Sequence, residues 1–114
     1  MEIKGKDYDV SYDAKSETVS CQGSLRLSGK DEYAPIVQLL NEVADREPTT
    51  ITLDLRQLKF LNSSGISMLS KFTIRVRQKE RIKIVVKGSK DIPWQGKSLK
   101  NLQRLMPKLV LELE

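Results

Sequence analysis

The sequence contains no histidine and only one cysteine, Cys21, among its 114 residues. Without histidine, the chain alone cannot build a Ser-His-Asp or Cys-His catalytic site, a histidine-containing zinc site, or imidazole acid-base chemistry. A single cysteine excludes an internal disulfide, a four-cysteine zinc site and an iron–sulfur cluster held by one chain. No GxxxxGK[ST] segment is present, which excludes P-loop nucleotide hydrolysis. These absences exclude the histidine- and cysteine-based routes to catalysis and to metal binding, and we expect no metal or cofactor.

Long apolar runs and a secretory leader are also missing. No run approaches the roughly 20 apolar residues that a membrane-spanning helix needs. The opening segment MEIKGKDYDV alternates charged with isolated apolar residues, unlike the apolar block of a secretory signal. The lone cysteine agrees with a reducing compartment. We therefore expect a cytoplasmic protein without membrane contact, and the length fits a single domain over residues 1–114.

Apolar residues recur at two periods, and these predict the order of strands and helices. Alternation predicts an opening hairpin whose strands flank the turn residues DAKSE, and helical spacing predicts a first helix over residues 34–46 with Pro35 in its first turn. Leu58, Phe60 and Leu61 are expected to continue the core contact through a loop, and Trp94 to cover an edge of the core. Further strands are predicted at 51–55, 82–86 and 108–114, and further helices after residue 65 and across 99–106.

The resulting order is β-β-α-β-α-β-α-β, which defines the α/β class. Strands that alternate with helices pair in parallel, so only the opening hairpin should be antiparallel. We therefore predict a mixed β-sheet with amphipathic helices packed mainly on one side.

The segment NSSG, residues 62–65, lies where a buried strand passes into a helix. Asn62, Ser63 or Ser64 can cap this helix, because short oxygen-bearing side chains accept bonds from its first N–H groups. Gly65 allows a close backbone approach. The N-terminus of a helix also favours an anion, so a phosphate on a serine here should leave the fold intact. The same phosphate adds about −1.5 to −2 charges and would repel an acidic partner. Capping alone remains the simpler interpretation.

The segment TTITLDLRQLKFLNSSGISMLSKF resembles the signature of STAS domains, the anti-anti-sigma factor fold. The typical pattern is an apolar strand ending in Asp-Leu, then Phe, an apolar residue, Asp-Ser-Ser/Thr-Gly and Leu. Asp54-Leu55, Phe60, Ser63-Ser64-Gly65 and Ile66 occupy those positions in order, and Asn62 stands where the family usually has aspartate.

The resemblance implies a regulator that binds proteins and carries out no catalysis. In the small bacterial members of that family, the phosphorylated serine corresponds to Ser63, with Ser64 as the alternative here. The unphosphorylated form binds a serine-kinase anti-sigma factor, phosphorylation by that kinase blocks binding, and a PPM-type phosphatase reverses it. We expect a monomer in isolation, with a docking surface made of Lys59, Asn62, Ser63, Ser64, Gly65, Ser67 and a partly exposed Met68.

Two other functions are compatible with the sequence. A STAS-like domain can be a constitutive scaffold or ligand-binding module without a phosphorylation switch. Alternatively, the net charge of +5 suggests nucleic-acid binding. The cations would be Arg75, Arg77, Lys79, Arg81 and Lys83. Aromatic residues do not interleave with this basic run after Phe72, which argues against base stacking and makes an acidic protein partner the better explanation.

Overall fold

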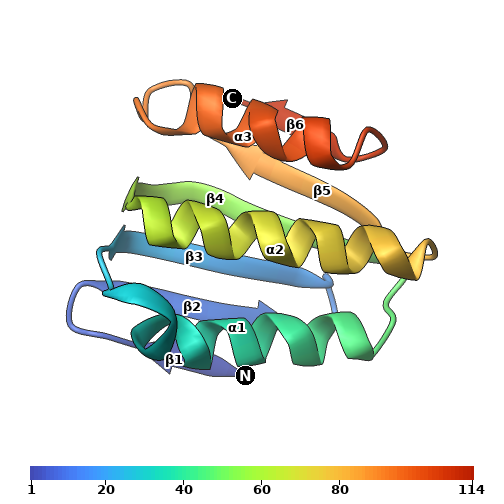
Figure 1. Ribbon diagram of the computed structural model, residues 1–114, viewed down its shortest axis with the longest axis horizontal. Helices are drawn as coiled ribbons and strands as arrows, with labels where there is room; N and C mark the ends of the chain where they lie inside the picture. Colours follow the sequence, from blue (N-terminus) through green and yellow to red (C-terminus); the bar gives the residue numbers. More distant parts are fainter.

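A computed structural model describes residues 1–114 and shows one six-stranded sheet covered by three helices (Figure 1). The strands lie side by side in their order along the chain, so each new strand is added at the same growing edge. In sequence order the elements are β1 (Glu2–Lys4), β2 (Tyr8–Asp13), β3 (Thr18–Leu25), α1 (Gly29–Asp45), β4 (Thr50–Leu61), α2 (Ser63–Lys79), β5 (Lys83–Gly88), α3 (Gln95–Leu105) and β6 (Val110–Leu113).

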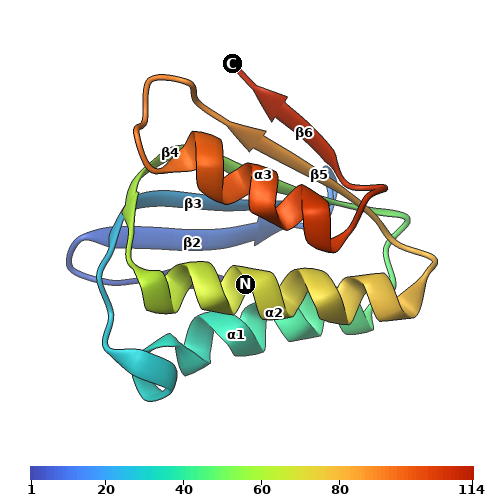
Figure 2. The same cartoon turned by 45° about the horizontal axis from the view of Figure 1, so that its top comes forward.

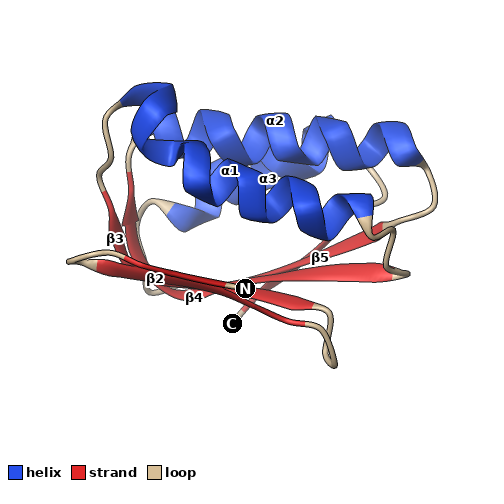
Figure 3. Cartoon of the chain, turned by 90° about the horizontal axis from the view of Figure 1, so that it is seen from below, coloured by secondary structure: helices blue, strands red, loops and turns tan.

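The predicted mixed α/β architecture is confirmed. Strands β1, β2 and β3 pair antiparallel, whereas β3, β4, β5 and β6 pair in parallel. All three helices lie on one face of the sheet, and the opposite face is uncovered (Figure 3). The core fills the space between the two layers, because the apolar stripe of each helix and one face of each central strand are buried there.

One strand was missed by the sequence prediction, and α1 and β4 differ most from their predicted bounds. Strand β1 was not predicted; it is three residues long with only Ile3 half-buried, too short for an alternation to be visible. Helix α1 begins at Gly29, five residues before the predicted start at residue 34. The prediction missed the first turn because that turn is polar and carries no apolar period. Pro35 is consequently in the second turn. Its side chain is exposed, so the carbonyl left without an N–H partner can bind water.

Strand β4 continues to Leu61, well past the predicted end at residue 55. Its register with β3 shifts twice, once between the partners of Ser20 and Gln22 and once between the partners of Gly23 and Ser24. At each shift β4 has one residue more than β3, which is a β-bulge. These extra residues break the period-two alternation, and for this reason the second half of the strand looked like a loop.

The second half of β4 extends beyond β5, which pairs with β4 only as far as Asp54. The carbonyl groups that β5 does not reach are bound by side chains at the start of α3. The amide nitrogen of the fully buried Gln95 donates to Leu55 O at 2.6 Å and to Leu58 O at 3.0 Å. Trp94 Nε1 also donates to Leu58 O, at 3.0 Å, and its ring packs against the core as predicted. Side chains thus replace a strand here.

The single thiol is buried. Burial, with a smaller contribution from Asp54, raises the pKa of Cys21 to about 12. The thiol therefore stays protonated and unreactive. No group of histidine, cysteine and acidic residues could hold a metal ion, and none of the helices is long and apolar enough to cross a bilayer.

Candidate functional site

The NSSG segment forms the junction between β4 and α2, as predicted. Because β3 and β4 are parallel, their carboxyl ends meet at one end of the sheet, and α1 and α2 both begin there (Figure 2). The backbone N–H of Asn62 donates to Leu25 O at 3.2 Å, which joins the two junctions directly. The site therefore consists of the β3–α1 and β4–α2 connections and the first turns of both helices.

Asn62 is the N-cap of α2, and every polar atom of its side chain is used. Its Oδ1 accepts from Gly65 N at 3.0 Å and from the Tyr33 hydroxyl at 2.6 Å. Its Nδ2 donates to Leu27 O at 2.8 Å. Aspartate, with no donor when ionised, would place a carboxylate oxygen against the Leu27 carbonyl. This geometry explains why asparagine suits the position where the STAS signature usually has aspartate.

Tyr33 of α1 is a site residue that the sequence prediction placed only in the core. Burial raises the pKa of its hydroxyl above the ordinary value, so it remains a hydrogen-bond donor. The ring is 2% exposed, yet the hydroxyl reaches Asn62 at 2.6 Å and Leu25 O at 3.2 Å. Tyr33 therefore ties the start of α1 to the start of α2. A tyrosine on an otherwise aliphatic helix stripe was the only signal in the sequence.

Gly65 is required for space, not for an unusual backbone conformation. It is buried in the first turn of α2. A Cβ at this position would overlap the Leu61 side chain and lie 2.7 Å from the Tyr33 hydroxyl. The missing side chain is what lets Tyr33 reach the cap.

Ser63 and Ser64 are exposed and are not used by the cap. Their side chains make no hydrogen bond within the chain, and their backbone N–H groups find no acceptor in it. Gly65 N and Ile66 N are already bound, to the side chain and the carbonyl of Asn62. The first turn of α2 contains no acidic residue. The two serines thus sit at an electropositive helix end with free hydroxyl and N–H groups.

A groove of about 920 Å³ begins at these serines and runs between α1 and α2. Ser67 lies exposed along it. The expectation that Met68 is partly exposed was wrong: it is buried, at 8% exposure, because it lies on the core-facing side of α2, and with Tyr33 it forms part of the groove floor. Lys59 is exposed on β4, before the cap, and does not line the groove. Among the predicted docking residues, Ser63, Ser64 and Ser67 are therefore brought together at the groove, whereas Gly65 and Met68 support it from below.

The basic side chains of α2 make contacts with different parts of the molecule. At the far end of the groove, Asp45 pairs with Arg75 at 3.0 Å and with Lys79 at 3.4 Å. The hydrogen bond from Arg75 is the largest of several effects that lower the pKa of Asp45. Arg77 turns the other way and donates to Leu105 O at 2.8 Å. The cations invoked for nucleic-acid binding consequently do not form one continuous free stripe.

Similarity to solved structures was found, although no family model and no curated protein matches the chain. SiaC of Pseudomonas aeruginosa is 12% identical, with a TM-score of 0.73 over 100% of this chain and 96% of that chain. The crystal structure of the diguanylate cyclase SiaD in complex with its activator SiaC, from the same organism, contains a chain with a TM-score of 0.74 and 12% identity. That match covers 99% of this chain and 97% of the other. At this identity the similarity establishes a shared fold.

The cap can be tested by truncating its side chain. Asn62→Ala removes three hydrogen bonds around the junction and should lower the free energy of unfolding by about 2–4 kcal/mol. Asn62→Asp keeps two acceptor contacts and loses the Leu27 bond, so its stability should fall between those of Asn62→Ala and the parent. Urea denaturation measures both. The exposed Asn101→Ala on α3 is the control and should change stability by about 0.5 kcal/mol at most. Equal stability of Asn62→Ala and the parent would contradict this account.

Proposed function

We propose that this chain is a protein-binding regulator, without enzymatic activity of its own, whose docking is blocked by phosphorylation of Ser63. One observation carries the proposal: Ser63 presents an unbonded, exposed hydroxyl in the first turn of α2, while Asn62 alone holds the cap. The modifiable residue and the residue that maintains the fold are therefore separate.

A phosphate on Ser63 should be tolerated by the folded domain. The N–H groups of Ser63 and Ser64 are unoccupied, the helix dipole favours an anion, and no acidic residue of the first turn opposes it. No hydrogen bond of the Ser63 side chain has to break. The effect of the phosphate should then be felt by whatever docks on this end of the molecule, because it brings about −1.5 to −2 charges to an uncharged side chain.

The docking surface includes Ser63, Ser64 and Ser67 and the groove that they border. Small side chains at the mouth of the groove allow a partner backbone to approach closely, and the buried Tyr33 and Met68 make its floor apolar. Lys59, on the other side of the cap, extends the surface along β4. We retain the partner classes expected from the STAS resemblance, a serine-kinase anti-sigma factor and a PPM-type phosphatase that acts on the phosphorylated form.

A second type of partner is suggested by the fold comparison. SiaC is described as the activator of the diguanylate cyclase SiaD, and this chain shares its fold over almost the full length of both. We therefore include a nucleotide cyclase as a target that the unphosphorylated form would bind and activate. In either case the chain supplies a binding surface, and the reaction belongs to the partner.

Phosphorylation of Ser63 is tested directly with the purified chain. We expect incubation with ATP and an extract of the producing cells to add one phosphate, which mass spectrometry should assign to Ser63. Ser63→Ala is expected to abolish the added mass, whereas Ser64→Ala should keep it. Phosphate on Ser64 alone would move the switch by one residue. Absence of phosphate on both serines would favour the constitutive scaffold.

A further inference from the structure

Phe60 is the most exposed large apolar residue inside a secondary-structure element, and the β-bulge in β4 explains its position. Gly23 pairs with Leu58 and Ser24 pairs with Phe60, so Lys59 is the extra residue. In a regular strand without this bulge, residues two apart share a face, and Phe60 would lie on the core-facing side with Leu58. With it, Leu58 and Leu61 are 1% and 3% exposed, and Phe60 is turned outward and 37% exposed. Bulges often redirect a side chain beside a functional site.

Arg26 stacks on the outward-facing ring. Its guanidinium carbon lies 4.5 Å from the ring centroid of Phe60. Arg26 makes no ion pair or hydrogen bond within the chain, so all of its N–H donors remain free while the ring holds the group in place. Such a stacked guanidinium is oriented in advance for two parallel hydrogen bonds to a carboxylate.

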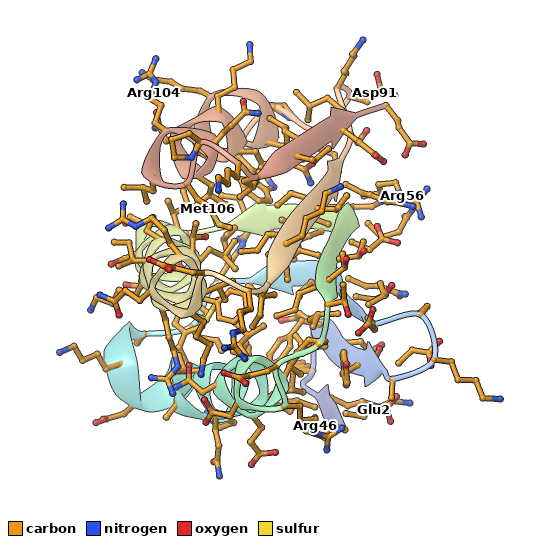
Figure 4. All side chains as sticks on the ribbon, turned by 90° about the vertical axis from the view of Figure 1, so that its right-hand side faces the viewer. Glu2, Arg46, Arg56, Asp91, Arg104 and Met106 are labelled. Carbon is orange, nitrogen blue, oxygen red and sulfur yellow. The ribbon has the colours of Figure 1, made fainter.

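Arg56 of β4 shows how differently a guanidinium with partners in its own chain is placed. Arg56 donates to both oxygens of Asp54, at 2.9 and 2.8 Å, and lies 3.6 Å from a carboxylate oxygen of Glu114. Its side chain points away from the helices, from the uncovered side of the sheet (Figure 4). The hydrogen bond from Arg56 is the main cause of the lowered pKa of Asp54. Arg56 is therefore neutralised by its own chain, whereas Arg26 is not.

The surroundings of Arg26 are basic and adjoin the proposed switch. Arg26 lines a hollow of about 660 Å³ together with Lys6, and Asp7 is the only carboxylate that lines it. Leu25 and Leu27, its two chain neighbours, both accept hydrogen bonds from Asn62, the residue before Ser63. Phe60 is three residues from Ser63, so their Cα atoms are at most about 11 Å apart.

We propose that Arg26 and Phe60 form a second contact point for the partner, which receives an acidic residue on Arg26 and an apolar side chain on Phe60. This inference rests on the proposed function and specifies the chemistry of the partner: a protein segment carrying an Asp or Glu beside an apolar residue. Arginine and aromatic side chains dominate the energetics of protein interfaces, and the free positive charge here needs an anionic complement. A nucleic acid is disfavoured because Phe60 is the single exposed aromatic residue, and Tyr8, which lines the hollow with Arg26, is half-buried and packed against the core.

Photo-crosslinking in the producing cells locates the contact. The crosslinking amino acid p-benzoylphenylalanine is placed at Phe60, at Ser67 in the groove, and at Glu112 on the distant strand β6 as the control. We expect the Phe60 and Ser67 probes to capture the same protein and the Glu112 probe to capture none. The peptide attached at Phe60 should contain an Asp or Glu. Capture at Ser67 without capture at Phe60, or an attached peptide without an Asp or Glu, overturns the inference.

The captured protein is then identified and purified, and its affinity for variants of this chain tests the role of the positive charge of Arg26. Arg26→Glu should weaken binding at least tenfold, and Arg26→Lys should weaken it less, because lysine keeps the charge but not the planar bidentate geometry. Arg46→Glu is the matched control, since Arg46 also stacks on an aromatic ring, at 5.9 Å from that of Tyr12, but lies where α1 ends. Unchanged affinity of Arg26→Glu overturns the second contact. If the Ser67 crosslink persists in Ser63→Asp, the proposed phosphorylation switch is refuted and the second contact is not. If the chain binds nucleic acid and no protein, both the switch and the second contact are refuted.

Discussion

Ser63→Asp is expected to weaken binding to the protein partner at least tenfold, whereas Ser63→Ala should bind as tightly as the parent. Ser63 is exposed and makes no hydrogen bond, so its hydroxyl contributes little to the fold and can be removed. A carboxylate at this position instead places a negative charge at the mouth of the groove, next to the surface that a partner must desolvate. The stability of Ser63→Asp should remain equal or rise slightly, because the charge lies at a helix N-terminus.

Binding is measured by isothermal titration calorimetry, and stability by thermal denaturation of the same samples. Asn101→Asp adds the same charge at an exposed site on α3 and should leave affinity unchanged. Ser64→Asp places the charge one residue further along the same turn and distinguishes a general effect of charge from a requirement at Ser63. If Ser63→Asp and Ser63→Ala bind equally, docking does not involve the start of α2 as proposed.

Gln95→Leu should lower the free energy of unfolding by about 2–6 kcal/mol, a range whose upper limit exceeds that for Asn62→Ala. The amide of this fully buried residue donates to Leu55 O and Leu58 O, and its Oε1 accepts from Ser89 N at 2.7 Å. Leucine has a similar volume but leaves the Leu55 carbonyl and the Ser89 N–H unsatisfied, each at about 1–3 kcal/mol. Leu58 O keeps its bond from Trp94.

In urea denaturation, the loss of stability of Gln95→Leu should appear as a lower midpoint of the unfolding transition. Gln103→Leu is the matched control: Gln103 donates one bond, at 3.2 Å, to Leu109 O from a part-buried position, so its loss should be about 1 kcal/mol. Because Gln95 supports the second half of β4, which leads into the cap, Gln95→Leu should also increase amide hydrogen exchange around Phe60 and Asn62. A midpoint no lower than that of the control would contradict the role assigned to Gln95.

Much of the fold could be predicted because its elements have clear periods. The amphipathic stripes of α1, α2 and α3 and the alternation in β2 and β3 led to the mixed sheet with helices on one side. Strand β1 escaped because an edge strand of three residues buries too little apolar surface. The bulges of β4 escaped because an extra residue depends on which strand is the neighbour, and no local pattern contains that information.

The candidate site could be predicted only in part. The order Asn-Ser-Ser-Gly between a strand and a helix located the cap within three residues, Asn62, Ser63 and Ser64, and the structure assigns it to Asn62. The contribution of Tyr33 could not be found, because it approaches Asn62 from 29 residues away in the sequence. Phe60 was expected to continue the core contact through a loop, which was wrong: the bulge turns it outward to meet Arg26.

The sequence by itself determined the α/β class, the strand-to-helix position of Ser63, and the absence of histidine and cysteine chemistry, since these depend on local periodicity and residue type. Only the tertiary structure decided that asparagine suits the cap, that Gly65 is needed for space, and that Arg26 and Phe60 lie beside the switch. Those features arise where β3 and β4 end together, and contacts between segments far apart in the chain depend on strand register, which no short stretch of sequence contains.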